Sequence, residues 1–348
     1  MRVLLTGNNG YIGSVLAPRL AAKGHQVVGF DSGYYRDCGI GAAPQSVVTQ
    51  IAKDIRQVTA ADFDGIEAVI HLAALSNDPL GAFDETLTTA INYEATRAIA
   101  RLSKAAGVRR FVYASTQSIY GISNADEPLD EDTSIKNPLT AYAKTKWAAE
   151  CELKKLNDDR FTVVCFRPST VFGASPRLRC DIVFNNLVAC AYTTGRIEIK
   201  SDGTPWRPVV HVADVCRAFC AGLEAPAELV AGQAFNVGIK DGNYTVRQLA
   251  EAAQRAVPNS ELVFTGEHGA DSRTYRVSFD KILTVLKDYY QPTWDLDRGG
   301  AELVTFFKKN SFTEAMFRGR TCNRLAQLEY LVKTNRLDAN LFWQQTHG

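Results

Sequence analysis

Residues 1–13, MRVLLTGNNGYIG, decide how this chain is expected to fold. The apolar run RVLLT predicts a strand, and Gly7, Gly10 and Gly13 follow it at the start of a helical pattern. The first glycine permits a tight turn, the second lets the backbone approach a pyrophosphate, and the third allows close helix–strand packing. Free N–H groups at the helix N-terminus would then face the phosphate charge. The segment therefore predicts a dinucleotide site, with further contacts from Asn9, Tyr11 and Ile12.

Acidic residues follow the next two apolar runs. Asp31 ends the run QVVGFD, where a carboxylate would accept hydrogen bonds from the adenosine ribose hydroxyls. It would also repel a 2′-phosphate, which favours NAD(H) over NADP(H), although the positive charge of Arg36 nearby would favour NADP(H). Asp54, with Ile55 beside it, is placed to approach the adenine amine, and helix capping is an equally good interpretation of Asp54.

Short apolar strands alternate with helical patterns through the first 175 residues, and the longest of these patterns predicts a helix over 86–108. Strands rich in Val, Ile and Leu that alternate with helices predict βαβ units and a parallel sheet buried on both faces. The predicted fold class is α/β, a Rossmann-type doubly wound parallel sheet with a smaller mixed α/β C-terminal cap. We expect a dinucleotide-binding domain over 1–175, to which strands from about 205–240 return, a smaller region over 176–310, and a helical tail over 311–348. The arginine-rich, amphipathic tail is expected to be a packing or dimer helix.

Composition narrows the function classes. The 348 residues are 46% hydrophobic and 22% charged, with a formal net charge of +1. Because no basic block or stripe is present, we expect no nucleic-acid or membrane partner. The N-terminus lacks the pattern of a secretory signal, no apolar run is long enough to cross a bilayer, and eight cysteines form no C-x-x-C pair. These features predict a cytoplasmic protein with reduced thiols and no metal site.

A tyrosine and a lysine stand four residues apart in LTAYAKTKWAAE, residues 139–150. Positions i and i+4 share one face of a helix, so Tyr142 and Lys146 would be neighbours. The pair could be a solvated surface contact. Beside a bound nicotinamide, however, the lysine ammonium and the positive ring would favour the phenolate, which makes the tyrosine a base for alcohol oxidation.

Five motifs now occur in order: TGNNGYIG (6–13), HLAA (71–74), ASTQSIYG (114–121), YAKTK (142–146) and RPSTVFG (167–173). With them the chain resembles the extended short-chain dehydrogenase/reductases, and within these the NAD-dependent enzymes that modify nucleotide-activated sugars. The resemblance runs from residue 1 to about 290. It implies a nucleotide-sugar substrate bound by the region 176–310, and a homodimer that pairs through helices, including the one with Tyr142. It also implies cofactor contacts from Leu72, Ala73, Ala74, Asn92, Tyr142, Lys146 and Pro168.

The same resemblance assigns roles at the reacting end. Thr116 aligns with the residue that hydrogen-bonds the sugar 4-hydroxyl, Tyr142 with the base that takes its proton, and Lys146 with the residue that positions cofactor and tyrosine. These three are the predicted catalytic residues. The predicted substrate contacts are Thr116, Gln117, Ser118, either Asn185 or Asn186, and the diphosphate-binding arginines Arg207 and Arg273.

The chain departs from the family pattern at two places. Sugar 4,6-dehydratases of the family carry Asp and Glu after the conserved Thr, whereas this chain has Gln117 and Ser118, which disfavours water elimination. Pro208 stands where the family usually has Asp, which weakens the assignment of Arg207. His71 and His211 fall in apolar strands and match structural histidines of the family.

Several functions remain open. The leading expectation is a 4-epimerase that oxidises the sugar C4 and returns the hydride to the opposite face. A 4-dehydrogenase or 4-ketoreductase would use the same three residues with net hydride transfer. A dehydrogenase for a non-sugar alcohol keeps the fold, but two arginines suit a diphosphate better. A non-catalytic NAD sensor is the remaining alternative, although such proteins typically lose the tyrosine or the lysine.

Overall fold

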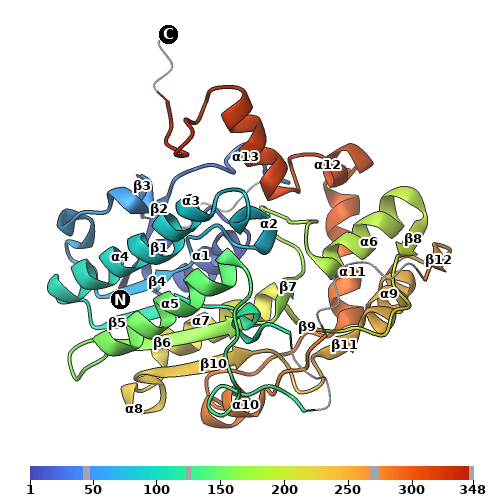
Figure 1. The fold of residues 1–348 in the computed structure, drawn as a ribbon. Coiled ribbons are helices and arrows are strands. Elements are labelled where there is room, and N and C mark those ends of the chain that lie inside the picture. Colours follow the sequence, from blue (N-terminus) through green and yellow to red (C-terminus); the bar gives the residue numbers. More distant parts are fainter. Residues whose placement is uncertain (42–47, 123–126, 267–273, 345–348) are drawn as a thin grey trace.

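The structure is a computed structural model that describes residues 1–41, 48–122, 127–266 and 274–344. Its described residues form a seven-stranded sheet in the order β10-β6-β5-β4-β1-β2-β3, and every neighbouring pair is parallel. This arrangement confirms the predicted Rossmann-type sheet (Figure 1). The strands are β1 Arg2–Thr6, β2 Gln26–Asp31, β3 Thr49–Ala52, β4 Ala68–His71, β5 Arg110–Ala114, β6 Thr162–Pro168 and β10 Gln233–Val237.

The sheet separates two apolar cores. Successive side chains of a strand point to opposite faces, so Val3 and Leu5 pack in one core and Leu4 in the other. Two helix pairs cover the two faces, as Figure 1 shows. The pair on the face of Val3 is α1 Gly13–Ala22 and α7 Val212–Glu224, and the pair on the face of Leu4 is α4 Ala95–Ala105 and α5 Ala141–Leu156.

The returning strands differ from the prediction. β10 joins the sheet beside β6, as expected for strands from 205–240. β9 Trp206–His211 instead lies between β7 Thr170–Phe172 and β11 Asn243–Thr245 in a separate three-stranded sheet. Between β6 and β7, the backbone N–H of Ser169 donates to Val237 O, the last residue of β10. From Thr170 the chain continues as β7, which pairs with β9 and not with the main sheet.

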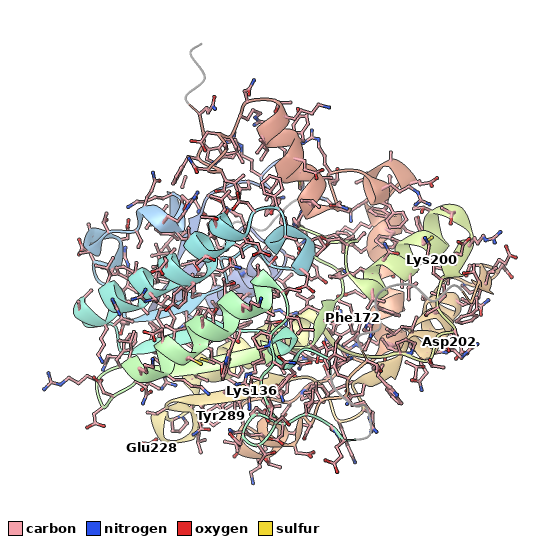
Figure 2. All side chains as sticks on the ribbon, viewed as in Figure 1. Lys136, Phe172, Lys200, Asp202, Glu228 and Tyr289 are labelled. Carbon is pink, nitrogen blue, oxygen red and sulfur yellow. The ribbon has the colours of Figure 1, made fainter. Side chains whose placement is uncertain are left out.

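The smaller region packs against the end of the sheet. Its helices are α6 Val183–Thr194, α9 Val246–Ala256 and α11 Leu296–Lys309, beside a parallel pair of β8 Arg196–Ile199 and β12 Glu261–Phe264. Phe172 lies between the two parts (Figure 2). Its ring is 5.0 Å from that of Phe184 in α6 and 5.2 Å from that of His211.

The C-terminal tail packs first against the smaller region and then against the main sheet. α12 Glu314–Arg318 packs on α6, and α13 Arg324–Lys333 then reaches the β2–β3 side of the sheet (Figure 1). There Trp343 Nε1 donates to Ser32 O at 2.6 Å, and the Tyr34 hydroxyl donates to Leu341 O at 2.7 Å. The tail is thus a packing element within the chain, one of the two expected roles.

The remaining elements are short. The long helix expected over 86–108 is interrupted by a π-helical turn, η3 Ala90–Glu94, between α3 Glu85–Thr89 and α4. In the described ranges no helix is long and apolar enough to cross a bilayer. The other short helices are η1 Ile55–Gln57, η2 Ala60–Phe63, α2 Asp78–Gly81, η4 Gln117–Tyr120, α8 Ala227–Val230 and α10 Asp280–Val285.

Candidate active site

A cavity of about 520 Å³ opens at the carboxyl ends of the parallel strands, which is where ligands bind in open α/β sheets. Residues at the ends of β1, β2, β4, β5 and β6 line it, together with α5, the smaller region and the tail. It therefore brings together most residues expected at the cofactor and substrate sites. Those that line it are Gly7, Gly10, Tyr11, Ile12, Gly13, Asp31, Asp54, Ile55, Leu72, Ala73, Ala74, Thr116, Gln117, Ser118, Tyr142, Lys146, Pro168 and Arg207.

The glycine loop has the close backbone packing that a dinucleotide requires. Gly7 has φ +72°, a conformation that favours glycine. A Cβ at Gly13 would lie 2.1 Å from Gly7 O and 2.7 Å from Asn8 Cα, so only glycine lets α1 begin against the loop. A Cβ at Gly10 would meet only Gly7 O, at 3.1 Å, which leaves this backbone open to the cavity. The cradle fits the pyrophosphate of NAD.

Asp31, the residue expected at the adenosine ribose, is held by two backbone hydrogen bonds. Its two carboxylate oxygens accept from Asn9 N at 3.1 Å and Gly33 N at 2.7 Å. Burial raises the pKa of Asp31, and these two bonds oppose the shift. Asn9 itself does not appear among the lining residues, so it acts here through its backbone N–H.

Asp54 caps η1, one of the two roles expected for it, by accepting from Arg56 N at 2.8 Å. The Arg56 guanidinium also binds both carboxylate oxygens, and Tyr34 donates to Oδ2 at 2.8 Å. Burial acts to raise the pKa of Asp54, but the bonds from Arg56 outweigh it and the pKa is lowered. Contact with adenine stays a prediction.

The three residues expected to do the chemistry lie on adjacent elements. Thr116 is the N-cap of η4 and accepts from Ser118 N at 3.2 Å. Tyr142 is in the first turn of α5, which Thr140 caps by accepting from Ala143 N. One turn later, Lys146 Nζ donates to Ala114 O at 2.8 Å.

Burial dominates the titration of this pair. It raises the pKa of Tyr142 to about 12, and the groups that lower it most are Thr116, by a side-chain hydrogen bond, and then Arg179. Burial also lowers the pKa of Lys146 to about 7. The sequence predicted that Lys146 would favour the phenolate beside a bound nicotinamide, and this stays a prediction.

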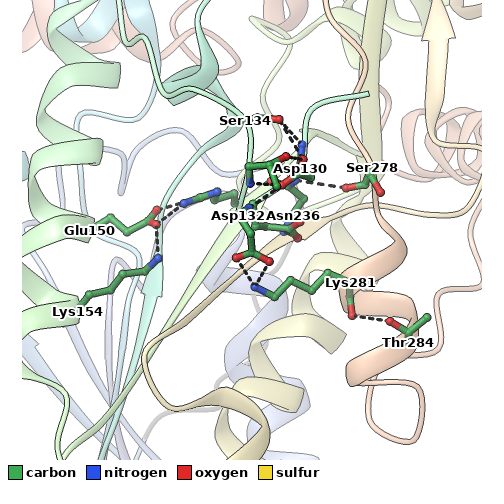
Figure 3. Close-up of polar contacts among 12 residues, drawn as sticks. Asp130, Asp132, Ser134, Glu150, Lys154, Asn236, Ser278, Lys281 and Thr284 are labelled. Atoms are coloured by element: carbon green, nitrogen blue, oxygen red, sulfur yellow. Dashed lines mark hydrogen bonds and ion pairs between the residues drawn. The ribbon is translucent and has the colours of Figure 1, made fainter. Parts of the chain in front are cut away.

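A buried polar network holds α5 at Glu150, one turn after Lys146 (Figure 3). Glu150 and Arg167 are both fully buried, with Arg167 Nη2 2.5 Å from Glu150 Oε1. Ser115 Oγ donates to the same carboxylate at 2.7 Å. Arg167 Nη1 donates to the Tyr120 hydroxyl, which donates to Asn236 Oδ1 at 2.9 Å. The network ties α5 to the strand ends that lead into Thr116.

Three predicted contacts lie outside the cavity lining. Asn92, in the π-helical turn, accepts from Leu75 N at 2.8 Å and donates to Leu75 O at 3.1 Å. Asn185 is fully buried and donates to Arg179 O, while Asn186 donates to Cys180 O. Each amide is engaged by protein groups of the described residues, and the ligand contacts expected of the three stay predictions.

The expected arginine pair is only partly described. Arg207 lines the cavity, and its Nη1 donates to Trp206 O at 2.9 Å. Arg273 lies outside the described residues. The sequence analysis missed Arg179, which binds both oxygens of Asp181 at 2.8 and 3.0 Å and donates to Ser76 Oγ. Its signal was the R-x-R spacing of Arg177 and Arg179 just after RPSTVFG.

Many other lining residues were not predicted, among them Tyr275 and Arg324 of the tail. No local motif marks either, because both reach the cavity only through the tertiary fold.

His71, His211 and the eight cysteines lie outside the cavity lining. His71 is buried between the hydroxyls of Thr6, at 2.7 Å, and Thr96, at 2.9 Å, and burial lowers its pKa to about 3. His211 caps α7 and stacks on Trp294. None of the eight cysteines, all in the described ranges, is in a disulfide. No group of three metal-binding side chains occurs in the part of the chain that is described.

Known proteins resemble this chain over most of its length. The profile of the NAD dependent epimerase/dehydratase family matches residues 3–238. A UDP-glucose 4-epimerase of Mycolicibacterium smegmatis is 32% identical over 89% of this chain and 100% of its own. A UDP-glucuronate 4-epimerase of Thermodesulfobacterium geofontis is 26% identical over 88% of this chain and 96% of its own. The solved structure of MoeE5 in complex with UDP-glucose and NAD has a TM-score of 0.75 at 26% identity, covering 89% of this chain and 99% of that one.

Proposed function

Because this chain belongs to the NAD dependent epimerase/dehydratase family, we propose that it is a nucleotide-sugar 4-epimerase. Membership confirms the resemblance and the NAD dependence predicted from the sequence. The chain is therefore an enzyme of nucleotide-sugar epimerisation or dehydration. Which of these reactions it performs, and through which residues, is our proposal.

The observation that carries the proposal is the set Thr116, Tyr142 and Lys146 on one cavity wall beside the glycine loop. Tyr142 is the base that takes the proton of the sugar 4-hydroxyl, and the Thr116 hydroxyl hydrogen-bonds the same oxygen. Because Thr116 already bonds Tyr142, it favours the phenolate that this step requires. Lys146, held by Ala114 O, orients the nicotinamide ribose. When bound, NAD supplies the acceptor for the C4 hydride.

Gln117 argues against dehydration. Its side-chain Nε2 donates to Arg167 O at 3.0 Å, and the residue is 1% exposed. A neutral amide held in this way cannot exchange a proton as a carboxylic acid does. The hydroxyl of Ser118, the next residue, lies 3.2 Å from that of Thr116. Elimination of water therefore lacks the carboxylic acid and carboxylate it requires, whereas oxidation and reduction at C4 use Tyr142 and need no such pair.

Net hydride transfer, as in a 4-dehydrogenase or 4-ketoreductase, is the second candidate, since it uses the same three residues. The test is incubation with UDP-, dTDP-, GDP- and CDP-sugars, with NADH absorbance and product NMR as readouts. An inverted C4 centre without net NADH supports the 4-epimerase, and NADH in proportion to substrate supports the dehydrogenase. Loss of a C6 oxygen from the product would contradict both. A sedimentation run in the same series tests the proposed cytoplasmic homodimer, which a single monomer species would refute.

A further inference from the structure

Arg324 brings a buried cation from the C-terminal tail into the cofactor cavity. It is the first residue of α13, capped by Asn323, whose side chain accepts from Ala326 N at 3.1 Å. Its side chain lines the cavity although the residue is only 2% exposed. The cap thus fixes where the helix begins, and with it the position at which this guanidinium enters.

The guanidinium of Arg324 is only partly satisfied by the protein. Nη2 donates to Arg177 O at 2.6 Å, and the guanidinium carbon lies 4.6 Å from the ring centre of Tyr35. Nη1 is buried and has no hydrogen-bond partner among the described residues. A buried donor of a charged group without an acceptor is costly. An acceptor from outside the chain is therefore expected at this position.

The surrounding charges indicate what that acceptor is. The charge of Arg179 lowers the pKa of Arg324 after burial, which is the larger cause, while Asp181 acts the other way. Asp181 is already bound by Nε and Nη2 of Arg179. With Asp31 and its neighbour Arg177 included, three guanidiniums face two carboxylates here, which leaves an excess of positive charge that suits an anion.

The position is also defined from the cofactor side. Asp31, at the expected ribose, is within electrostatic reach of Arg324, because Arg324 opposes the raised pKa of Asp31. The glycine loop, which begins at Gly7 and lines the same cavity, holds the phosphates on the neighbouring side. The anion nearest to both Asp31 and this loop in a bound dinucleotide is its pyrophosphate.

We propose that Arg324 binds the pyrophosphate of the dinucleotide from the side opposite the glycine loop, and that the tail thereby closes the cofactor site. Contacts elsewhere in the tail hold it on the loop that follows Asp31. Gln327 Nε2 donates to Tyr34 O at 3.0 Å, and Arg56 Nη1 donates to Asn340 O at 2.8 Å. In Figure 1, α13 lies above α2, with which it is in contact.

The first test measures ligand binding and needs no sugar. Dissociation constants for NAD, ADP and adenosine are measured by calorimetry, or by displacement of fluorescent NADH, for the intact chain and three variants. Arg324→Gln removes the charge, Arg324→Lys keeps it without the planar fork, and Arg320→Gln is the control. Arg320 belongs to the same segment and donates to Gln327 Oε1, yet it does not line the cavity.

Arg324→Gln should weaken NAD and ADP by about 10- to 100-fold, as expected for one charged hydrogen bond, and leave adenosine unchanged. Arg324→Lys should fall between, and Arg320→Gln should bind all three ligands like the intact chain. Unchanged NAD binding in Arg324→Gln would overturn the proposal. Equal weakening of ADP and adenosine would also overturn it, because the effect would then come from tail packing.

A second measurement on the unaltered chain covers the case in which Arg324→Gln does not fold. Limited proteolysis of the tail is followed by mass spectrometry with NAD, with ADP, with adenosine and without ligand. NAD and ADP should slow cleavage in residues 311–344, and adenosine should not. Cleavage at one rate in all four samples would refute closure by the tail.

Discussion

Replacing Glu150 by glutamine should destabilise the chain strongly. Both Glu150 and Arg167 are fully buried, and the carboxylate accepts from Arg167 Nε at 3.1 Å, from Arg167 Nη2 at 2.5 Å and from Ser115 Oγ at 2.7 Å. Glutamine keeps the shape but turns an NH₂ toward these donors and leaves the arginine charge buried. Breaking one side of such a pair costs about 3–5 kcal/mol, a large share of the ~5–15 kcal/mol that stabilises a native domain.

The measurement is urea unfolding followed by tryptophan fluorescence, with Glu152→Gln as the matched control. Glu152 lies on the same helix and pairs with Lys155 at 2.7 Å on the surface, where removal of the pair should have no measurable effect. A double variant, Glu150→Met with Arg167→Met, leaves no buried charge and should recover part of the loss. If Glu150→Gln unfolds at the urea concentration of Glu152→Gln, the network does not stabilise α5 and this reasoning is wrong.

The same pair predicts a pH dependence with a definite sign. Burial acts to raise the pKa of Glu150, but Arg167 outweighs it, so the folded-state pKa lies below the ordinary value of 4.5. A lowered carboxyl pKa contributes stability that is present above the ordinary value and lost as the pH falls through the folded value. The difference between the unaltered chain and Glu150→Gln should therefore be largest near neutral pH and shrink below about pH 4.

Three further predictions concern the site. Tyr142→Phe should lower turnover by about 10²- to 10⁴-fold while calorimetry shows unchanged NAD binding, and weaker NAD binding would indicate a structural role. Thr116→Val removes the hydrogen bond that lowers the pKa of Tyr142, so the rising limb of the pH–rate profile should move to higher pH by about one unit; a profile that only drops in height would contradict this. Gly13→Ala places a Cβ 2.1 Å from Gly7 O, so NAD should no longer raise the melting temperature, and a retained shift would refute the role given to this glycine.

Local patterns predicted the elements that line the cofactor half of the cavity. RVLLT forms β1, and the glycine loop that follows it lines the cavity, both as predicted from residues 1–13. Asp31 is the last residue of β2, as expected. Periodicity failed where packing altered a regular element. The helix expected over 86–108 carries a π-helical turn, which presents the amide of Asn92 to Leu75. Helix propensity does not predict such a turn, because the turn depends on the tertiary contacts of the helix.

Residues of one motif can also separate in space. The asparagines of FNNL seemed to be ligand contacts, yet Asn185 bonds the backbone of Gly173 and Arg179, while Arg179 itself lines the cavity. Whether the motif itself contacts a ligand stays a prediction. Which of its neighbours faces the cavity depends on how α6 packs against β7.

The sequence alone predicted the parallel α/β sheet, the glycine loop for a dinucleotide and the pairing of Tyr142 with Lys146 on one helix face. These follow from short-range rules, since a strand, a glycine turn and a helical spacing each depend on residues within about one to four positions. The role of Thr116 beside them came from the family resemblance. The tertiary structure alone decided that Arg324, nearly 300 residues from Asp31, lines the same cavity. It also decided that Glu150 and Arg167 form a buried ion pair. Such pairings depend on the packing of distant elements, for which no local pattern exists.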